Sequence, residues 1–158
     1  MRENYDLARM LLSKQHLQTA RRLLDEKEAD ATVGIPIVDL DMPPVEYEGQ
    51  IYKFHAARIK PGKWVGAHWH GKGMEPYAVW RSIGEMNIGS PRKTRPPAWE
   101  SPEKLMAGDM FVVKGRKVHC MRNIGEGDLD FGFACPDDHL SEADRFMVTD
   151  LPPHFPSP

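Results

Sequence analysis

Two histidines and a glutamate stand close together in the sequence and could bind a metal ion. His68 and His70 are separated by one residue, and Glu75 follows them after a Gly-containing stretch. Side chains alternate between the two faces of a β-strand, so both imidazoles are expected on one face. The glycines favour a turn that would fold the Glu75 carboxylate back towards the rings. Neutral imidazoles and a carboxylate are ligands of iron, zinc, manganese and nickel, so the pattern predicts a transition-metal site.

A fourth candidate ligand, His119, lies in a second segment that runs from Gly108 to Asn123. Together the two segments resemble the two signature motifs of the cupin superfamily, G-x5-H-x-H-x3,4-E-x6-G and G-x5-P-x-G-x2-H-x3-N. The matched residues are Gly62, His68, His70, Glu75, Gly108, His119 and Asn123. The closing glycine of the first motif comes late, at Gly84, and Lys114-Gly115-Arg116 replaces the P-x-G turn of the second. The resemblance covers roughly residues 50 to 136.

The resemblance implies an all-β fold, the cupin double-stranded β-helix or jelly-roll barrel. It does not extend to the N-terminal segment, where the pattern of apolar residues described below adds an α-helix to the predicted fold. It also implies one divalent transition metal held by His68, His70, Glu75 and His119. Three imidazoles and a carboxylate leave two positions of a six-coordinate ion open for substrate, water or dioxygen. Iron is the metal expected first. Zinc, nickel, manganese and copper stay open, because all of them suit this ligand set.

The remaining histidines and the cysteines are expected to have structural roles. Four histidines outside the motifs are predicted to be surface residues or hydrogen-bonded core residues: His16, His55, His139 and His154. Alternation along the strand that carries His119 places Cys120 on the opposite face, outside the cavity. Cys120 and Cys135 are too few for a disulfide framework and are expected to be reduced.

The predicted elements divide the chain into three parts. Residues 4 to 29 carry apolar residues at spacings of three and four without Gly or Pro, which predicts one helix. Residues 32 to 44 predict an extended arm that could pair with an edge strand of its own barrel or of a neighbour. The expected boundaries are 1–44 for the helix and arm, 45–140 for the barrel and 141–158 for the C-terminal tail.

Short strands separated by turns are predicted throughout the barrel region. A strand over 64–70 would carry the two motif histidines and, by alternation, Trp64 on the same face. Four prolines predict an extended loop over 90–106. Ser141 begins a stretch that could form a short helical turn, and the tail from Leu151 is predicted to be extended.

Several aromatic and apolar side chains are expected beside the metal. Trp64, Met121 and Phe133 are candidates for the substrate pocket, with core packing as the other explanation for each. Tyr77 is expected on the Glu75 side of its strand, where its hydroxyl could give a proton or a hydrogen bond to the substrate. A core ring with a satisfied hydroxyl is the alternative for Tyr77, and both stay open.

Composition narrows the class of protein. The chain has 158 residues, enough for one domain, with 41% hydrophobic and 28% charged residues as in ordinary globular proteins. A net charge of −2 provides no basic field for nucleic acid, and no apolar run is long enough for a membrane span. The first residues lack a signal-peptide hydrophobic region, so a cytoplasmic protein is expected. A homodimer formed through the helix or the arm is also expected.

Three functions fit the sequence. The first is a metal-dependent cupin enzyme that oxidises a small organic substrate with dioxygen, and the resemblance favours it slightly. The second is a cupin isomerase, epimerase or lyase, in which the metal acts as a Lewis acid on a sugar or hydroxy acid. The third is a non-catalytic cupin that binds a small molecule. A fold does not decide a reaction, so all three stay open.

Overall fold

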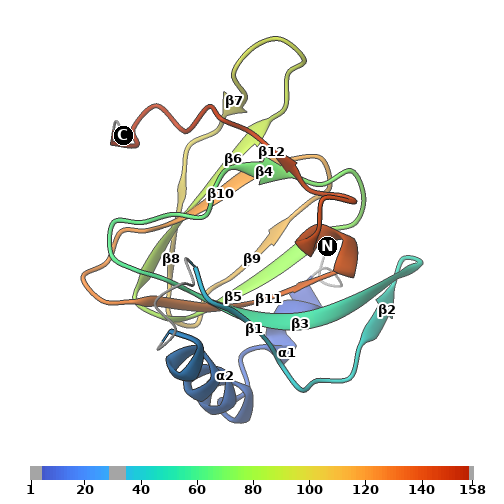
Figure 1. Cartoon of the computed structure of the whole chain (residues 1–158), viewed down its shortest axis with the longest axis vertical. Coiled ribbons are helices and arrows are strands. Elements are labelled where there is room, and N and C mark those ends of the chain that lie inside the picture. Colours follow the sequence, from blue (N-terminus) through green and yellow to red (C-terminus); the bar gives the residue numbers. More distant parts are fainter. Residues whose placement is uncertain (1–4, 29–34, 157–158) are drawn as a thin grey trace.

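Two antiparallel β-sheets form a barrel, and helices lie on the outside of one of them (Figure 1). The computed structural model describes residues 5–28 and 35–156. Within these residues each sheet has six strands. The predicted all-β barrel with an N-terminal helical segment is therefore confirmed.

The first sheet contains the central strands of the barrel. Its members are β1 Ile37–Asp39, β2 Val45–Tyr47, β3 Gln50–Ile59, β5 Glu75–Arg81, β9 Met110–Val113 and β11 Leu129–Cys135. Their order is β1-β3-β11-β5-β9, and β2 also pairs with β3. Every residue of β11 is buried, because one face of this strand meets the helices and the other meets the barrel interior.

The second sheet closes the other side of the barrel. Its members are β4 His68–Trp69, β6 Ile83–Ser90, β7 Ala98–Trp99, β8 Glu103–Met106, β10 Val118–Asn123 and β12 Phe146–Met147. Their order is β12-β4-β10-β6-β7, and β8 also pairs with β6. The register sets His119 of β10 opposite His68 of β4. Pairing between strands far apart in the sequence thus brings two predicted ligands together.

The N-terminal helical segment is broken in two. Helices α1 (Asp6–Met10) and α2 (Lys14–Glu28) replace the single helix predicted over 4–29, whose end residues lie outside the described ranges. The Leu11 carbonyl accepts a hydrogen bond from the Trp80 indole at 2.8 Å. Ser13 directly precedes α2, and its Oγ accepts a hydrogen bond from the His16 backbone N–H at 3.4 Å. Docking on the barrel therefore interrupts the helix that the periodicity predicts. Neither of these described helices is long and apolar enough to cross a membrane.

The two helices cover the outer face of the first sheet (Figure 1). Apolar residues from both sides form this layer: Leu7, Leu11, Ala20 and Leu24 with Phe54, Ala78, Trp80 and Ala134. The buried Arg58 guanidinium also joins α2 to the barrel. It donates to Asp130 of β11 at 2.6 Å, and to Asp25 and Glu28 of α2 at 2.6 and 2.8 Å.

The predicted extended arm pairs with its own barrel. Strand β1 runs antiparallel to β3, with Val38 opposite Ala56. Of the segment predicted as 32–44, residues 32–34 lie outside the described ranges. For the described residues of this segment, the structure supports the first of the two alternatives, which is pairing with the chain's own barrel.

Three local predictions are wrong. The strand predicted over 64–70 is reduced to β4 and a bridge between Trp64 and Arg122. The segment 90–106 is not one loop, because β7 and β8 within it pair with β6. Residues 141–144 form turns and bends, and the helical turn lies earlier, as a 3-10 helix over Asp137–Leu140. In each case pairing or packing with distant residues decides the backbone more than local propensity does.

Candidate metal centre

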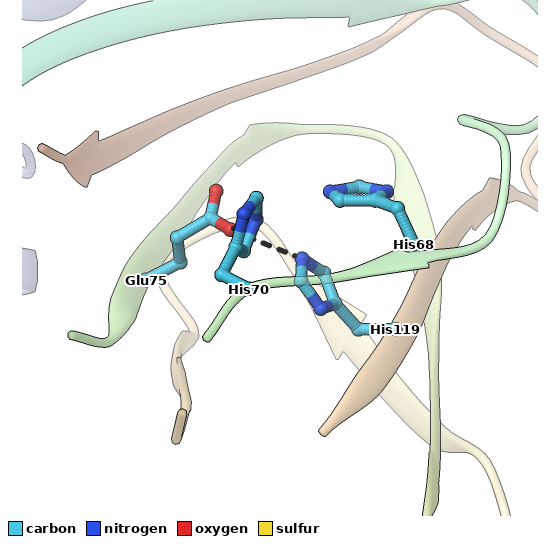
Figure 2. Close-up of side chains that lie close together, drawn as sticks. All are labelled: His68, His70, Glu75 and His119. Atoms are coloured by element: carbon cyan, nitrogen blue, oxygen red, sulfur yellow. Dashed lines mark ion pairs between the residues drawn. The ribbon is translucent and has the colours of Figure 1, made fainter. Parts of the chain in front are cut away.

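The four predicted metal ligands converge inside the barrel (Figure 2). His68 lies on β4, His70 directly follows that strand, Glu75 begins β5 and His119 lies on β10. Each offers one ligand atom, and these atoms all lie within 4.8 Å of one another. All four residues are buried, the most exposed at 8%. The motif residues therefore meet in space as ligands of one ion would.

A backbone carbonyl orients each of the three imidazoles. The distances from Nδ1 to the carbonyl oxygen are 2.7 Å for His68 and Gly66, 2.6 Å for His70 and Asp144, and 3.1 Å for His119 and Lys117. A carbonyl oxygen can only accept, so Nδ1 carries the proton and donates it. In the neutral ring Nε2 then presents a lone pair. Metal-binding histidines are commonly oriented in this way.

The Glu75 carboxylate faces these ring nitrogens. Its Oε2 lies 3.1 Å from His119 Nε2 and in closer contact with His70 Nε2. Burial alone would raise the pKa of the Glu75 carboxyl, but the surrounding histidines hold that pKa well below its usual range. Burial, together with the neighbouring His119, lowers the pKa of His68 to about 3. An ionised carboxylate and a neutral imidazole are the forms that bind a cation.

Three of the ligand atoms are buried without a hydrogen-bond partner: His70 Nε2, Glu75 Oε2 and His119 Nε2. Unsatisfied polar atoms inside a protein destabilise it, and lone pairs that face one another repel. A divalent cation among them would satisfy all three atoms. The residues present therefore fit a metal ion, and imidazole with carboxylate suits iron, manganese, nickel, copper and zinc.

Comparison with known proteins identifies the fold. No protein-family model matches the sequence, and no curated protein does either. A protein with a double-stranded β-helix domain from Klebsiella pneumoniae is similar in structure, with a TM-score of 0.53 and 17% identity over 80% of this chain and 95% of its own. The chain has the cupin fold.

Enzymes occur among the structures similar to this chain. An oxalate oxidase has a TM-score of 0.54 and 17% identity, over 75% of this chain and 57% of its own. A Lactobacillus farciminis oxalate decarboxylase has a TM-score of 0.46 and 20% identity over 60% of this chain, and the chain spans only 30% of its length. The likeness to the oxalate oxidase shows a shared fold and leaves the reaction to be argued from the site.

A cavity of about 250 Å³ lies beside the candidate ligands. His68, Glu75 and His119 form part of its wall. Most other wall residues are apolar, among them Ile37, Val65, Met121, Phe131, Phe133 and Leu140. Arg145, whose side chain is exposed, also lines it and was not expected from the sequence. A cavity with apolar walls and a few polar groups is typical of a small-molecule site.

Three predicted residues beside the metal line this cavity: Tyr77, Met121 and Phe133. The Tyr77 hydroxyl donates to Glu75 Oε1 at 3.3 Å. Burial, with the charge of Glu75, raises the pKa of Tyr77 well above its usual value. Tyr77 therefore keeps its proton and donates it in the hydrogen bond to the Glu75 carboxylate.

The prediction that Trp64 lines the pocket is wrong. Its ring packs on Phe155 at a centroid distance of 5.2 Å, in an apolar cluster that also contains Cys120. Residues 65–67 are not in a regular strand, so alternation does not carry over from His68 to Trp64. Val65 and Gly66 line the cavity instead. Cys120 lies away from the cavity, as predicted.

A fourth histidine enters the site from outside the motifs. His139 is 2% exposed and lies in the 3-10 helix that follows β11. Its ring stacks on that of His70, with a centroid distance of 3.8 Å and an interplanar angle of 1°. The sequence predicts either a surface histidine or a hydrogen-bonded core histidine here, and it does not predict its neighbours, because no periodic pattern relates this helix to the barrel interior. His55, in contrast, pairs with Asp39 at 2.9 Å, as expected of a core histidine.

Proposed function

We propose that this cupin is a mononuclear metal-dependent enzyme that acts on a small organic substrate. The observation that carries the proposal is that the ligands also form the wall of the cavity. His68, Glu75 and His119 belong both to the group whose ligand atoms lie within 4.8 Å and to the lining of the 250 Å³ cavity. A molecule in the cavity would therefore lie next to a bound ion.

The chain supplies orientation, a proton donor and a dry environment. A bound ion would act as a Lewis acid or activate dioxygen. Tyr77 is the candidate proton donor or substrate hydrogen bond, because it is protonated, contacts Glu75 and lines the cavity. The aromatic walls, Phe131 and Phe133, limit the access of water and so strengthen electrostatic interactions with the substrate.

The substrate class follows from the lining of the cavity. Apolar walls suit an apolar body, whereas the hydroxyls of a sugar would need polar partners there. Arg145 can bind a carboxylate with two parallel hydrogen bonds, and in the described part of the chain no ion pair occupies it. The proposed substrate is therefore a small, mainly apolar organic acid.

Oxidation with dioxygen is the reaction we favour, by a small margin. The alternative reaction is that of an isomerase, epimerase or lyase. Because the apolar cavity disfavours a sugar, the substrate of such an enzyme would be an organic hydroxy acid. An oxalate oxidase shares the fold, but a shared fold does not transfer a reaction. A cupin that only binds its ligand is the third outcome of the experiment below.

The first experiment is elemental analysis of the isolated protein beside H119A, with H55A as a control that also removes a buried histidine. We expect near one iron per chain in the wild type and in H55A, and loss of the metal in H119A. Oxygen uptake is then measured with a panel of small carboxylic acids and phenols. Near one zinc, nickel or manganese without oxygen uptake would favour the lyase or isomerase. A wild-type protein that takes up no metal on reconstitution would overturn the proposal.

The substrate class has its own test. In the same assays, R145M is expected to raise KM for carboxylic acids while leaving the metal content unchanged. An equal KM in both proteins would remove Arg145 from the substrate site. A ligand that binds and is recovered unchanged from the metal-loaded protein, with no turnover, would support the binding protein.

A further inference from the structure

The C-terminal segment of the chain contacts both the candidate ligands and the cavity. Its strand β12 pairs with β4, the strand that carries His68. Just before β12, Asp144 lies beside the loop of residues 70–72 that follows β4. The next residue, Arg145, lines the cavity. Asp144 therefore stands where the ligand loop and the cavity wall meet.

Asp144 accepts three hydrogen bonds from this loop. Its carbonyl oxygen accepts from His70 Nδ1 at 2.6 Å. One carboxylate oxygen accepts from the Gly71 backbone N–H at 2.7 Å, and the other accepts from the Lys72 backbone N–H at 3.1 Å. Hydrogen bonds to an ionised carboxylate are roughly twice as strong as those between neutral groups. The side chain thus fixes the backbone directly after His70, while the main chain of the same residue orients the imidazole.

The Asp144 carboxylate is enclosed by the loop that it binds. Its side chain is 14% exposed, whereas the residues on either side of it in the sequence, Ala143 and Arg145, are exposed. A Cβ added to Gly71 would lie only 2.9 Å from Asp144 Oδ1. Glycine at position 71 therefore allows a close approach that a larger residue would disturb.

We propose that Asp144 is a positioning residue of the metal centre, whose carboxylate holds the loop 70–72 so that His70 Nε2 stays aimed at the other ligands. The proposal rests on the metal centre of the proposed function. His68 and His119 lie on strands that pair with each other, whereas His70 lies in the loop after β4 and depends more on its neighbours for orientation. Outer partners of this kind commonly tune the affinity of a site for its metal.

The structural alternative is that Asp144 only attaches the C-terminal segment to the barrel. Its loss would then lower the stability of the metal-free protein and leave the metal affinity of the folded protein unchanged. A positioning role predicts instead that the affinity falls. Metal affinity measured below the unfolding temperature therefore separates the two roles.

Three substitutions change the contact in different ways. D144A removes both carboxylate oxygens and keeps the backbone carbonyl. D144N removes the charge and keeps one oxygen that can accept from Gly71. G71A leaves Asp144 in place, but its methyl group crowds the carboxylate. D109A is the matched control, because the Asp109 carboxylate accepts from the Met106 backbone N–H at 2.8 Å between β8 and β9, outside the cavity lining.

The probe is Co²⁺ added to metal-free protein, and its affinity and stoichiometry are measured. We expect one Co²⁺ per chain in each protein. Loss of an outer hydrogen-bond partner typically weakens metal binding about 10- to 100-fold, so D144A should lose about 10-fold or more and D144N should lose less. G71A should also weaken binding. In the D144A background the same substitution should cost little, because no carboxylate is left to displace.

NMR of the metal-free proteins gives a readout that does not depend on the metal. The His70 Nδ1 proton should exchange with water faster in D144A than in the wild type, because the loop that holds the ring is released. D109A should match the wild type in exchange and in Co²⁺ affinity. The comparison of D144N and G71A with the wild type does not require D144A to fold.

Other outcomes overturn the inference in distinguishable ways. Wild-type Co²⁺ affinity in D144A, with a lower Tm in EDTA, would leave Asp144 only the attachment of the C-terminal segment and would leave the proposed function intact. Additive losses in the G71A/D144A double variant would show that Gly71 and Asp144 act separately. Weaker binding with unchanged exchange at His70 would show that Asp144 acts by another route. A wild-type protein that binds no Co²⁺ would overturn both the inference and the proposed function.

Discussion

Replacing Glu75 by glutamine tests whether its carboxylate binds the ion. E75Q keeps the size of the side chain and can keep an oxygen facing Tyr77, but it removes the negative charge. That charge lies among the ring nitrogens, with Oε2 3.1 Å from His119 and 3.6 Å from His139. We therefore expect E75Q to weaken metal binding much more than it changes the metal-free fold.

The expected size of the effect follows from binding linkage. At a free metal concentration of 100 times Kd, binding stabilises the wild type by about 2.7 kcal/mol. If E75Q weakens binding by about 100-fold, the same concentration stabilises it by only about 0.4 kcal/mol. The difference of about 2.3 kcal/mol corresponds to a shift in Tm of roughly 5 to 9 °C for a domain of this length.

Thermal unfolding measures this difference when each protein is compared with and without metal. Subtracting the Tm in EDTA removes any change in the metal-free protein. E85Q is the matched control, because Glu85 is a partly buried glutamate that pairs with His154 at 2.7 Å outside the centre. E85Q should show the wild-type metal-dependent shift. An equal shift in E75Q and the wild type would refute the assignment of Glu75 as a ligand.

Three further predictions concern stability and assembly. R58M should lower the free energy of unfolding by about 3–5 kcal/mol in urea titration, because it leaves the buried Asp130 carboxylate only its longer ion pair with the more exposed Arg81, at 3.7 Å. An unchanged midpoint and slope would contradict this. Hydrogen bonding to Lys60 lowers the pKa of Glu28. The contribution of Glu28 to stability is therefore present above its ordinary pKa near 4.5 and should be lost as the pH falls through the lower pKa of the folded protein. A series of Tm measurements at different pH values measures this loss, and the loss should be smaller in K60M. Light scattering at micromolar concentration should give the mass of a homodimer, and a monomeric mass would count against an interface formed by the helices or residues 32–44.

The sequence alone predicts the cupin barrel and the four motif residues that are its candidate metal ligands. His68 and His70 fall on one side because side chains two positions apart on an extended chain point the same way. The spacing to Glu75 allows a turn between His70 and Glu75. These are local relations, and the motif residues meet in the structure as predicted. The same local reasoning fails for Trp64, where the backbone leaves the strand and the alternation ends.

Only the tertiary structure places His139 and Arg145 at the cavity, and only it breaks the N-terminal helix at Leu11. His139 reaches the centre because the chain turns back after β11 and stacks its ring on His70, a contact between residues far apart in sequence. The helix breaks because the Leu11 carbonyl is hydrogen-bonded to Trp80 on the barrel. Sequence periodicity reports which face of an element is buried, whereas contacts between elements depend on how the sheets and turns bring distant residues together.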